Sequence, residues 1–283
     1  MKTGMNLLLW TTEVTAEHYP LLAALKETGF DGVEIPIGDG PESSYRALRR
    51  EIERLGLLCT TVTIMRPEHN AISLDASIRR AARKRLEWLI ERTALLGGEL
   101  LCGPLHSAWK TFVGRGPTED EKRFGADVMR AAGEAAARAG IRLELEFLNR
   151  FECYLLNTTA DTRDFVRRIG LPSVQVHYDT HHAHYEEKDV TRAITGAAKE
   201  IGHVHVSEND RGTPGRGQVR WDETFAALKK IGYDGWLVIE SFSRLEPAFA
   251  AAVHIWRENA ASAEEVYREG LRFMNERWAR AKA

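Results

Sequence analysis

Short apolar runs alternate along the chain with longer segments in which apolar residues recur every three or four positions. The short runs are rich in Val, Ile, Leu and aromatic residues, which is typical of buried parallel strands. Eight strands are expected, at Met5–Trp10, Gly32–Ile37, Leu57–Ile64, Leu100–Leu105, Ile141–Phe147, Val174–Asp179, His203–Ser207 and Trp236–Ser241. The longer segments predict helices at Tyr19–Thr28, Ser44–Leu55, Leu74–Leu96, Thr118–Ala139, Ala160–Ile169, Val190–Ile201, Trp221–Ile231 and Ala263–Arg280.

Glycine marks the return from most of these helices to the next strand. It suits the left-handed position that closes a helix. The glycines concerned are Gly29, Gly56, Gly97, Gly140, Gly170, Gly202 and Gly232. Strand–helix units in such a series predict an α/β fold, a (β/α)₈ TIM barrel made by a single domain that spans residues 1–283. An open doubly wound sheet is the alternative, but no Gly-x-Gly-x-x-Gly motif follows the first strand.

The composition of the chain argues against two classes of binding partner, nucleic acids and anionic membranes. The 283 residues carry a formal net charge of -2, with both signs scattered along the chain. A nucleic-acid binder or a protein of anionic membranes would show a basic stripe, so neither partner is expected. No apolar run reaches the length of a membrane span or a signal peptide. The three cysteines, Cys59, Cys102 and Cys153, are odd in number and widely spaced, which favours reduced thiols in a cytoplasmic protein.

Residues able to bind a metal stand at the ends of four successive strands. Side chains alternate along a strand, so Glu144 shares a face with Glu146 and His203 shares a face with His205. The second member of each pair lies nearer the carboxyl end, where barrel enzymes carry their chemistry. The expected ligands are Glu146, Asp179, His205 and Glu240.

Strands five to eight are neighbours in a barrel, so these four groups can converge on one ion. Three carboxylates and one imidazole form an oxygen-rich set without thiolate. Such a set suits Mn²⁺, Mg²⁺ or Co²⁺ better than structural Zn²⁺. A carboxylate on a buried strand is costly unless a cation or another partner compensates its charge.

Several motifs accompany these ligands. The motif Asp179-Thr-His-His182 begins at the last residue of the sixth strand. The motif Ile239-Glu240-Ser-Phe242 lies at the end of the eighth strand. The longer motifs are Leu105-His-Ser-Ala-Trp109, Glu146-Phe-Leu-Asn-Arg-Phe-Glu152 and His203-Val-His-Val-Ser-Glu-Asn-Asp-Arg211-Gly-Thr-Pro-Gly-Arg-Gly217. In order and spacing they resemble the D-tagatose 3-epimerase group, which includes the D-psicose (allulose) and L-ribulose 3-epimerases. That group lies among the sugar phosphate isomerase/epimerase-like TIM barrels.

The resemblance implies a role for each residue. One divalent ion, with Mn²⁺ expected first, would be bound by the four ligands, and Glu146 and Glu240 would also act as the acid/base pair. Relatives are often oligomeric, which implies a homodimer or homotetramer. The sugar would be contacted by Glu152, His182, Arg211, His106 and Trp109.

The implied reaction is the epimerisation of a free ketohexose or ketopentose at C3. A cation and hydrogen-bond donors stabilise a cis-enediolate while one carboxylate removes the C3 proton and the other returns one to the opposite face. Asn6, Val14 and Arg66 depart from the residues expected at the C4–C6 end. Alternatives are an aldose–ketose or hydroxypyruvate-type isomerase, a metal-dependent nuclease of the endonuclease IV kind, or a non-catalytic sugar-binding protein.

Overall fold

The computed structural model describes residues 1–282 and contains a closed barrel of eight parallel strands. Strand β1 pairs with β2 on one side and with β8 on the other, where Met5 stands opposite Ile239. The TIM-barrel prediction is therefore confirmed. The strands are β1 (Lys2–Asn6), β2 (Gly32–Pro36), β3 (Leu58–Val62), β4 (Leu100–Gly103), β5 (Arg142–Glu146), β6 (Val174–Asp179), β7 (Ile201–Val206) and β8 (Trp236–Ile239).

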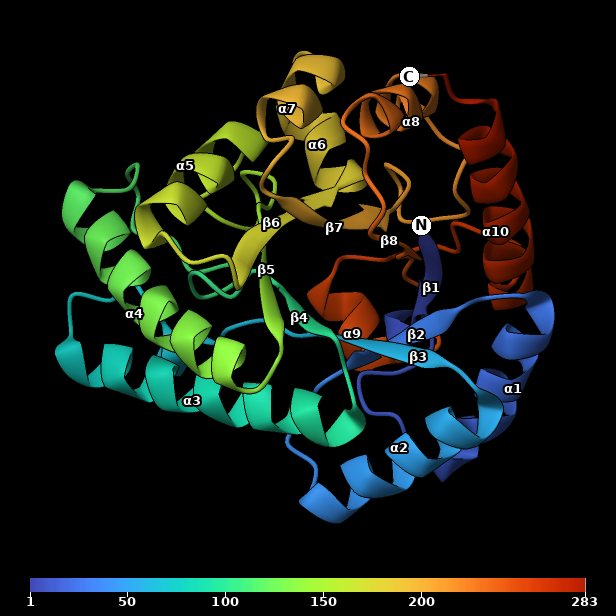
Figure 1. Ribbon diagram of the computed structural model, residues 1–283, viewed down its shortest axis with the longest axis horizontal. Coiled ribbons are helices and arrows are strands. Elements are labelled where there is room, and N and C mark those ends of the chain that lie inside the picture. The colour runs from blue at the N-terminus through green and yellow to red at the C-terminus, as the bar shows by residue number, and fades with distance from the viewer. Residues whose placement is uncertain (283) are drawn as a thin grey trace.

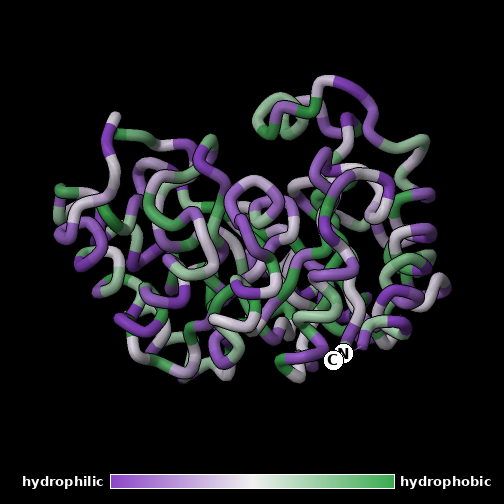
Figure 2. Tube along the Cα trace, turned by 90° about the horizontal axis from the view of Figure 1, so that it is seen from above, coloured by the Kyte–Doolittle hydropathy of each residue, from purple (hydrophilic) through white to green (hydrophobic). Residues whose placement is uncertain are grey.

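Helices form a ring outside the barrel, whereas α9 lies inside this ring in projection (Figure 1). Patches of hydrophobic and hydrophilic residues alternate along the outer segments (Figure 2), as expected of helices with one face on the barrel. No helix among the described residues is long and apolar enough for a membrane crossing. The helices are α1 (Tyr19–Thr28), α2 (Glu42–Leu55), α3 (Ala76–Leu96), α4 (Glu119–Arg138), α5 (Thr159–Ile169), α6 (Thr180–Glu186), α7 (Val190–Gly196), α8 (Trp221–Lys230), α9 (Pro247–Ala252) and α10 (Ala263–Arg280). The described part of the chain also contains three 3₁₀ turns, η1 (Leu7–Leu9), η2 (Ala16–His18) and η3 (Pro67–His69).

The first strand is shorter at its carboxyl end than the sequence predicted. It ends at Asn6, whose side chain accepts a hydrogen bond from the backbone N–H of Leu8 and starts the turn η1. Leu7 and Leu9 are buried in this turn. A short apolar run is equally compatible with a strand and with a buried turn, so hydrophobicity alone placed the end of the strand wrongly.

Glycine closes the helices at six of the seven expected positions. These are Gly29, Gly56, Gly97, Gly140, Gly170 and Gly232, all of which have positive φ. The prediction for Gly202 was wrong, because this residue lies inside β7 and α7 already ends at Gly196. A Cβ at Gly202 would lie 2.5 Å from the carboxylate oxygens of Glu144. Glycine is needed here for space beside a buried carboxyl group.

Candidate metal centre and active site

The strand register brings the four predicted ligands together. Glu146 and Asp179 end β5 and β6, His205 stands opposite Asp179 in the β6–β7 ladder, and Glu240 follows the last residue of β8. One ligand atom from each residue can be chosen so that all four atoms lie within 4.8 Å of one another. Their side chains are buried. The arrangement has the size and the donor atoms of a site for one divalent ion.

His205 supplies a test of whether a metal fits. Its Nε2 lies 2.6 Å from Oε1 of Glu34, a distance typical of a strong hydrogen bond. Its Nδ1 has no hydrogen-bond partner among residues 1–282 and lies 3.6 Å from Oδ2 of Asp179 and 3.4 Å from Oε1 of Glu240. A buried nitrogen without a partner, facing two carboxylates, is what a metal-binding imidazole presents before coordination. These residues therefore fit a divalent ion.

Two acidic residues of this cluster, Glu146 and Asp179, have pKa values shifted in opposite directions. Burial raises the pKa of Glu146 well above its ordinary value, and the carboxylates of Glu240 and Asp179 raise it further. Burial also disfavours the charged form of Asp179, but Arg211 and His205 hold its pKa well below the ordinary value. Within one cluster, Glu146 thus has the higher affinity for a proton and Asp179 stays ionised.

The loop after β7 folds Arg211 back over the cluster. The residue has a positive φ of 62°, and its side chain is buried against the ring of Phe242. Its Nη1 lies 2.5 Å from Oε2 of Glu240 and 3.3 Å from Oδ2 of Asp179. The neighbouring Glu240 and Asp179 charges raise the pKa of Arg211, overcoming the opposite effect of burial. Arg211 therefore carries a permanent positive charge at the edge of the cluster.

Asn149 organises the predicted sugar-binding residues. Its backbone N–H and its Nδ2 each lie 3.0 Å from Nδ1 of His182, and Nδ2 also donates to Oε1 of Glu152 at 2.9 Å. Trp109 donates its indole N–H to the other oxygen of Glu152 at 2.8 Å. Burial raises the pKa of Glu152, but His182 and Arg211 outweigh it and lower the pKa to about 2. Glu152 is therefore an anion held in a fixed orientation.

His182 and Arg211 each direct a hydrogen-bond donor toward the same place beside the cluster. Because Nδ1 of His182 accepts from a backbone N–H, the proton of the neutral ring is on Nε2. This Nε2 lies 3.0 Å from Nη2 of Arg211, which is also a donor, and 3.6 Å from Oε1 of Glu146. An oxygen acceptor on a ligand would satisfy both donors, so the pair is suited to bind a hydroxyl or carbonyl group.

His106, which the resemblance assigned to the sugar, forms hydrogen bonds within the protein. The ring is fully buried, its Nε2 donates to the backbone oxygen of Glu146 at 2.9 Å, and its Nδ1 lies 3.0 Å from the hydroxyl of Ser107. Burial lowers the pKa of His106 to about 4, so the ring is neutral. Both nitrogens have partners inside the protein, and through Nε2 the ring of His106 supports the end of β5.

A cavity of about 640 Å³ opens at the carboxyl ends of β1, β2 and β3. Arg66 lines this cavity, as does the ring of Phe249 from α9. Asn6 and Val14 do not line it; Val14 is buried in the core, and Asn6 is buried with its amide 3.1 Å from Oε1 of Glu240. Of the three residues that departed from the expected pattern, Arg66 is thus the one on the cavity wall.

Comparison with known proteins identifies the family. The model of the xylose isomerase-like TIM barrels matches residues 22–277. A ketose 3-epimerase of Arthrobacter globiformis is 31% identical over 269 residues, which cover 94% of this chain and 93% of that protein. An L-ribulose 3-epimerase of Mesorhizobium japonicum is 33% identical and covers 93% of this chain and 91% of that protein. The crystal structure of D-psicose 3-epimerase with D-tagatose from Clostridium cellulolyticum has a TM-score of 0.90 and 30% identity, covering 98% of this chain and 99% of that one.

The chain belongs to the ketose 3-epimerase family. Members of this family are carbohydrate epimerases of the isomerase class, and the family resemblance seen in the sequence motifs is therefore confirmed.

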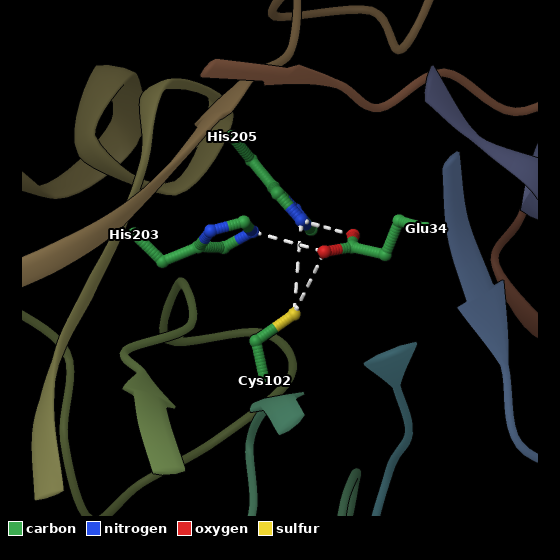
Figure 3. A group of neighbouring side chains, drawn as sticks. All are labelled: Glu34, Cys102, His203 and His205. Atoms are coloured by element: carbon green, nitrogen blue, oxygen red, sulfur yellow. Dashed lines mark hydrogen bonds and ion pairs between the residues drawn. The ribbon is translucent and has the colours of Figure 1, made fainter. Parts of the chain in front are cut away.

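Within this ketose 3-epimerase fold, sequence reasoning missed Glu34. Glu34 on β2 contacts both His203 and His205 (Figure 3). A signal was present, because Glu34 is the one charged residue in the otherwise apolar strand Gly32–Pro36. A charge in such a position is costly without a partner. Its partners are 169 and 171 residues away in sequence, and no local pattern reveals them.

No helix was predicted directly after Asp179. The segment forms the helix α6, which Asp179 caps by accepting from the backbone N–H groups of His181 and His182. The side chain of His181 is buried and donates from Nδ1 to the backbone oxygen of Glu208. The capping hydrogen bonds therefore fix the orientation of the Asp179 carboxylate and also start the helix that places His182 beside the cluster.

Proposed function

We propose that the protein is a metal-dependent ketose 3-epimerase that interconverts the C3 epimers of a free ketohexose or ketopentose. The observation that carries the proposal is the convergence of two buried glutamates, Glu146 and Glu240, with Asp179 and the unpartnered Nδ1 of His205. A sugar-binding protein without catalysis would not need two glutamates in one buried ligand set.

Glu146, Asp179, His205 and Glu240 would hold the ion, for which Mn²⁺ is proposed ahead of Co²⁺ and Mg²⁺. When bound, a divalent ion would supply Lewis-acid polarisation of the ketose carbonyl at C2. The donor set supports this choice, because carboxylate oxygens and one imidazole suit these ions better than thiolate-preferring metals.

The proton at C3 would be moved by the two glutamates. In one direction, the carboxylate of Glu146 removes the proton from one face of C3 and the carboxyl group of Glu240 delivers a proton to the opposite face. In the reverse direction the two residues exchange roles. The burial of both glutamates in one ligand set supports this pairing, because a carboxylate withdrawn from water is a stronger base than one in solution.

The O1–O3 end of the ketose would be held by Arg211, His182 and Glu152. Arg211 and His182 would donate to sugar oxygens that gain negative charge as the C3 proton leaves, which favours the enediolate-like transition state. Glu152, ionised and fixed by Asn149 and Trp109, would accept hydrogen bonds from sugar hydroxyl groups. Trp109 would also form part of the wall beside the sugar.

The C4–C6 end of the ketose would lie in the cavity at β1–β3, where Arg66 is available for a hydroxyl group. We also propose a homodimer or homotetramer located in the cytoplasm. Large apolar side chains that are exposed support an assembly, namely Phe151, Leu245 and Trp256. Three buried cysteines that form no disulfide agree with a reducing compartment.

The deciding experiment is incubation of metal-loaded protein in D₂O with D-fructose, D-tagatose and L-ribulose, followed by NMR of the products. We expect deuterium at C3 together with the C3 epimers. Deuterium found at C1 or C2 alone would contradict C3 epimerisation and favour an aldose–ketose isomerase. No exchange in any of the sugars would contradict both reactions.

A further inference from the structure

One buried carboxylate beneath the proposed metal centre lies within hydrogen-bond distance of side chains from four strands. Glu34 on β2 is fully buried, and three of its partners are drawn with it in Figure 3. Oε1 lies within hydrogen-bond distance of Asn6 Nδ2 (3.0 Å) and His205 Nε2 (2.6 Å). Oε2 lies near Thr60 Oγ1 (2.9 Å), His203 Nε2 (2.9 Å) and Cys102 Sγ (3.3 Å).

Which group donates in each of these hydrogen bonds follows from the protons that each group carries. The amide nitrogen of Asn6 can only donate, and Oε1 of Glu34 therefore accepts from it. An ionised carboxylate has no proton of its own, so Nε2 of His205 must carry the proton in the 2.6 Å contact. In the neutral ring that leaves the lone pair on Nδ1, the atom that faces Asp179 and Glu240.

The same residues could instead be thought to bind a second metal, because Glu34, Cys102, His203 and His205 offer four ligand atoms. The distances oppose this reading. Two ligands about 2.0–2.1 Å from a tetrahedral ion are about 3.3 Å apart. The 2.6 Å between Nε2 of His205 and Oε1 of Glu34 is too short for that geometry and is typical of a charge-assisted hydrogen bond.

We propose that Glu34 is a positioning residue for the metal centre. By accepting the Nε2–H of His205 it fixes the ring orientation, makes Nδ1 the coordinating atom and increases its basicity. Asn6 and His203 hold Glu34 in place. The Nδ2 of Asn6 also donates to Oε1 of Glu240 at 3.1 Å. The amide of Asn6 therefore connects the carboxylate of Glu34 to Glu240, one of the proposed metal ligands. The inference rests on the proposed ligand set but not on the proposed reaction.

The test compares Glu34→Gln with a matched control, Glu144→Gln. Glu144 is also a fully buried glutamate on a barrel strand, and its hydrogen bond is to Arg142 and not to any proposed ligand. Mn²⁺ affinity is measured by electron paramagnetic resonance titration, and folding by circular dichroism and thermal unfolding. We expect the dissociation constant to increase by about 10- to 100-fold in Glu34→Gln and to stay within about twofold in the control.

A spectroscopic readout separates hydrogen bonding from a merely structural effect. In Mg²⁺-loaded protein the Nε2–H proton of His205, assigned by its loss in His205→Asn, should resonate far downfield and shift upfield in Glu34→Gln. A folded Glu34→Gln protein with wild-type Mn²⁺ affinity and an unshifted proton would overturn the inference. So would two bound metal equivalents, the second lost in Cys102→Ala.

The outcomes also separate this inference from the proposed function. Wild-type protein that binds Mn²⁺ but causes no exchange at C3 would refute the epimerase proposal, and the affinity comparison would still decide the role of Glu34. Wild-type protein that binds none of Mn²⁺, Co²⁺ and Mg²⁺ would overturn both the metal centre and the role of Glu34.

Discussion

The guanidinium group of Arg211 lies 2.5 Å from a carboxylate oxygen of Glu240, one of the two proposed acid/base residues. The same nitrogen donates to the hydroxyl of Ser207 at 2.8 Å, and the group packs on Phe242. Since the side chain is buried, its charge acts on the carboxylates with little screening by water. Arg211 thus couples a fixed positive charge to the residues that would move the proton.

Replacement of Arg211 by Lys should reduce kcat/KM for C3 epimerisation by about 10²- to 10³-fold. An ammonium group keeps the charge but cannot contact Glu240, Ser207 and His182 at once or stack on a ring as a guanidinium does. Steady-state kinetics of the purified variant provide the measurement. Arg220→Lys, on an exposed arginine near the same loop, serves as the control and should stay within about twofold. Equal activities in the two variants would refute the role of Arg211.

Glu240→Gln should lower turnover by about 10²- to 10⁴-fold while part of the metal binding is kept. The amide retains one ligand oxygen but cannot accept or deliver a proton at C3. Deuterium incorporation and Mn²⁺ binding are measured on the same sample, with the exposed Glu258→Gln as the control. Normal turnover in Glu240→Gln would exclude an acid/base role for Glu240.

Removal of the divalent ion should lower the thermal stability of the protein and abolish epimerisation. An ion present at one hundred times its Kd stabilises the folded state by about 2.7 kcal/mol. For a chain of this size each kcal/mol corresponds to roughly 2–4 °C in Tm. Unfolding is followed by circular dichroism after chelation and after Mn²⁺ is returned. The Mn²⁺-dependent change should be absent in His205→Asn, and its persistence there would place the ion elsewhere.

Glu144 should make the protein less stable as the pH rises. Burial raises its pKa from 4.5 to about 8, although Arg142 opposes the effect. Between these values the unfolded chain releases a proton that the folded chain keeps, so the free energy of unfolding decreases with increasing pH. Glu144→Gln cannot titrate, and its stability relative to wild type should therefore increase between about pH 4.5 and 8. Urea unfolding at about pH 5, 7 and 9 measures the difference, and a pH-independent difference would contradict the prediction.

Arg66→Ala should change the preference among sugars and leave the chemistry at C3 intact. The side chain lies on the cavity wall and is tied only loosely to Asp39, at 3.6 Å. Loss of one hydrogen bond from a charged donor should raise KM for a ketohexose by about tenfold or more. KM for the shorter L-ribulose should change less. Equal changes for both sugars would show that Arg66 does not contact the far end of the substrate.

Much of the barrel was determined by local sequence. The apolar runs predicted all eight strands, and β6 and α10 have the predicted bounds. Errors arose where an apolar run is compatible with both a strand and a turn, as at Leu7–Leu9, which forms a 3₁₀ turn with Leu7 and Leu9 buried. The helix α6 was missed because Asp179 was interpreted as a ligand alone, whereas its carboxylate also caps that helix.

The sequence by itself determined which residues reach the carboxyl ends of the strands, because alternation along each strand and the order of the strands do not depend on distant parts of the chain. Glu146, Asp179, His205 and Glu240 could be chosen on that basis. Only the closed barrel decided what stands beneath and beside them. It places Glu34 of β2 against His205 of β7, and Arg211 against Glu240, because contacts across a barrel depend on its closure and side-chain packing, which no local periodicity records.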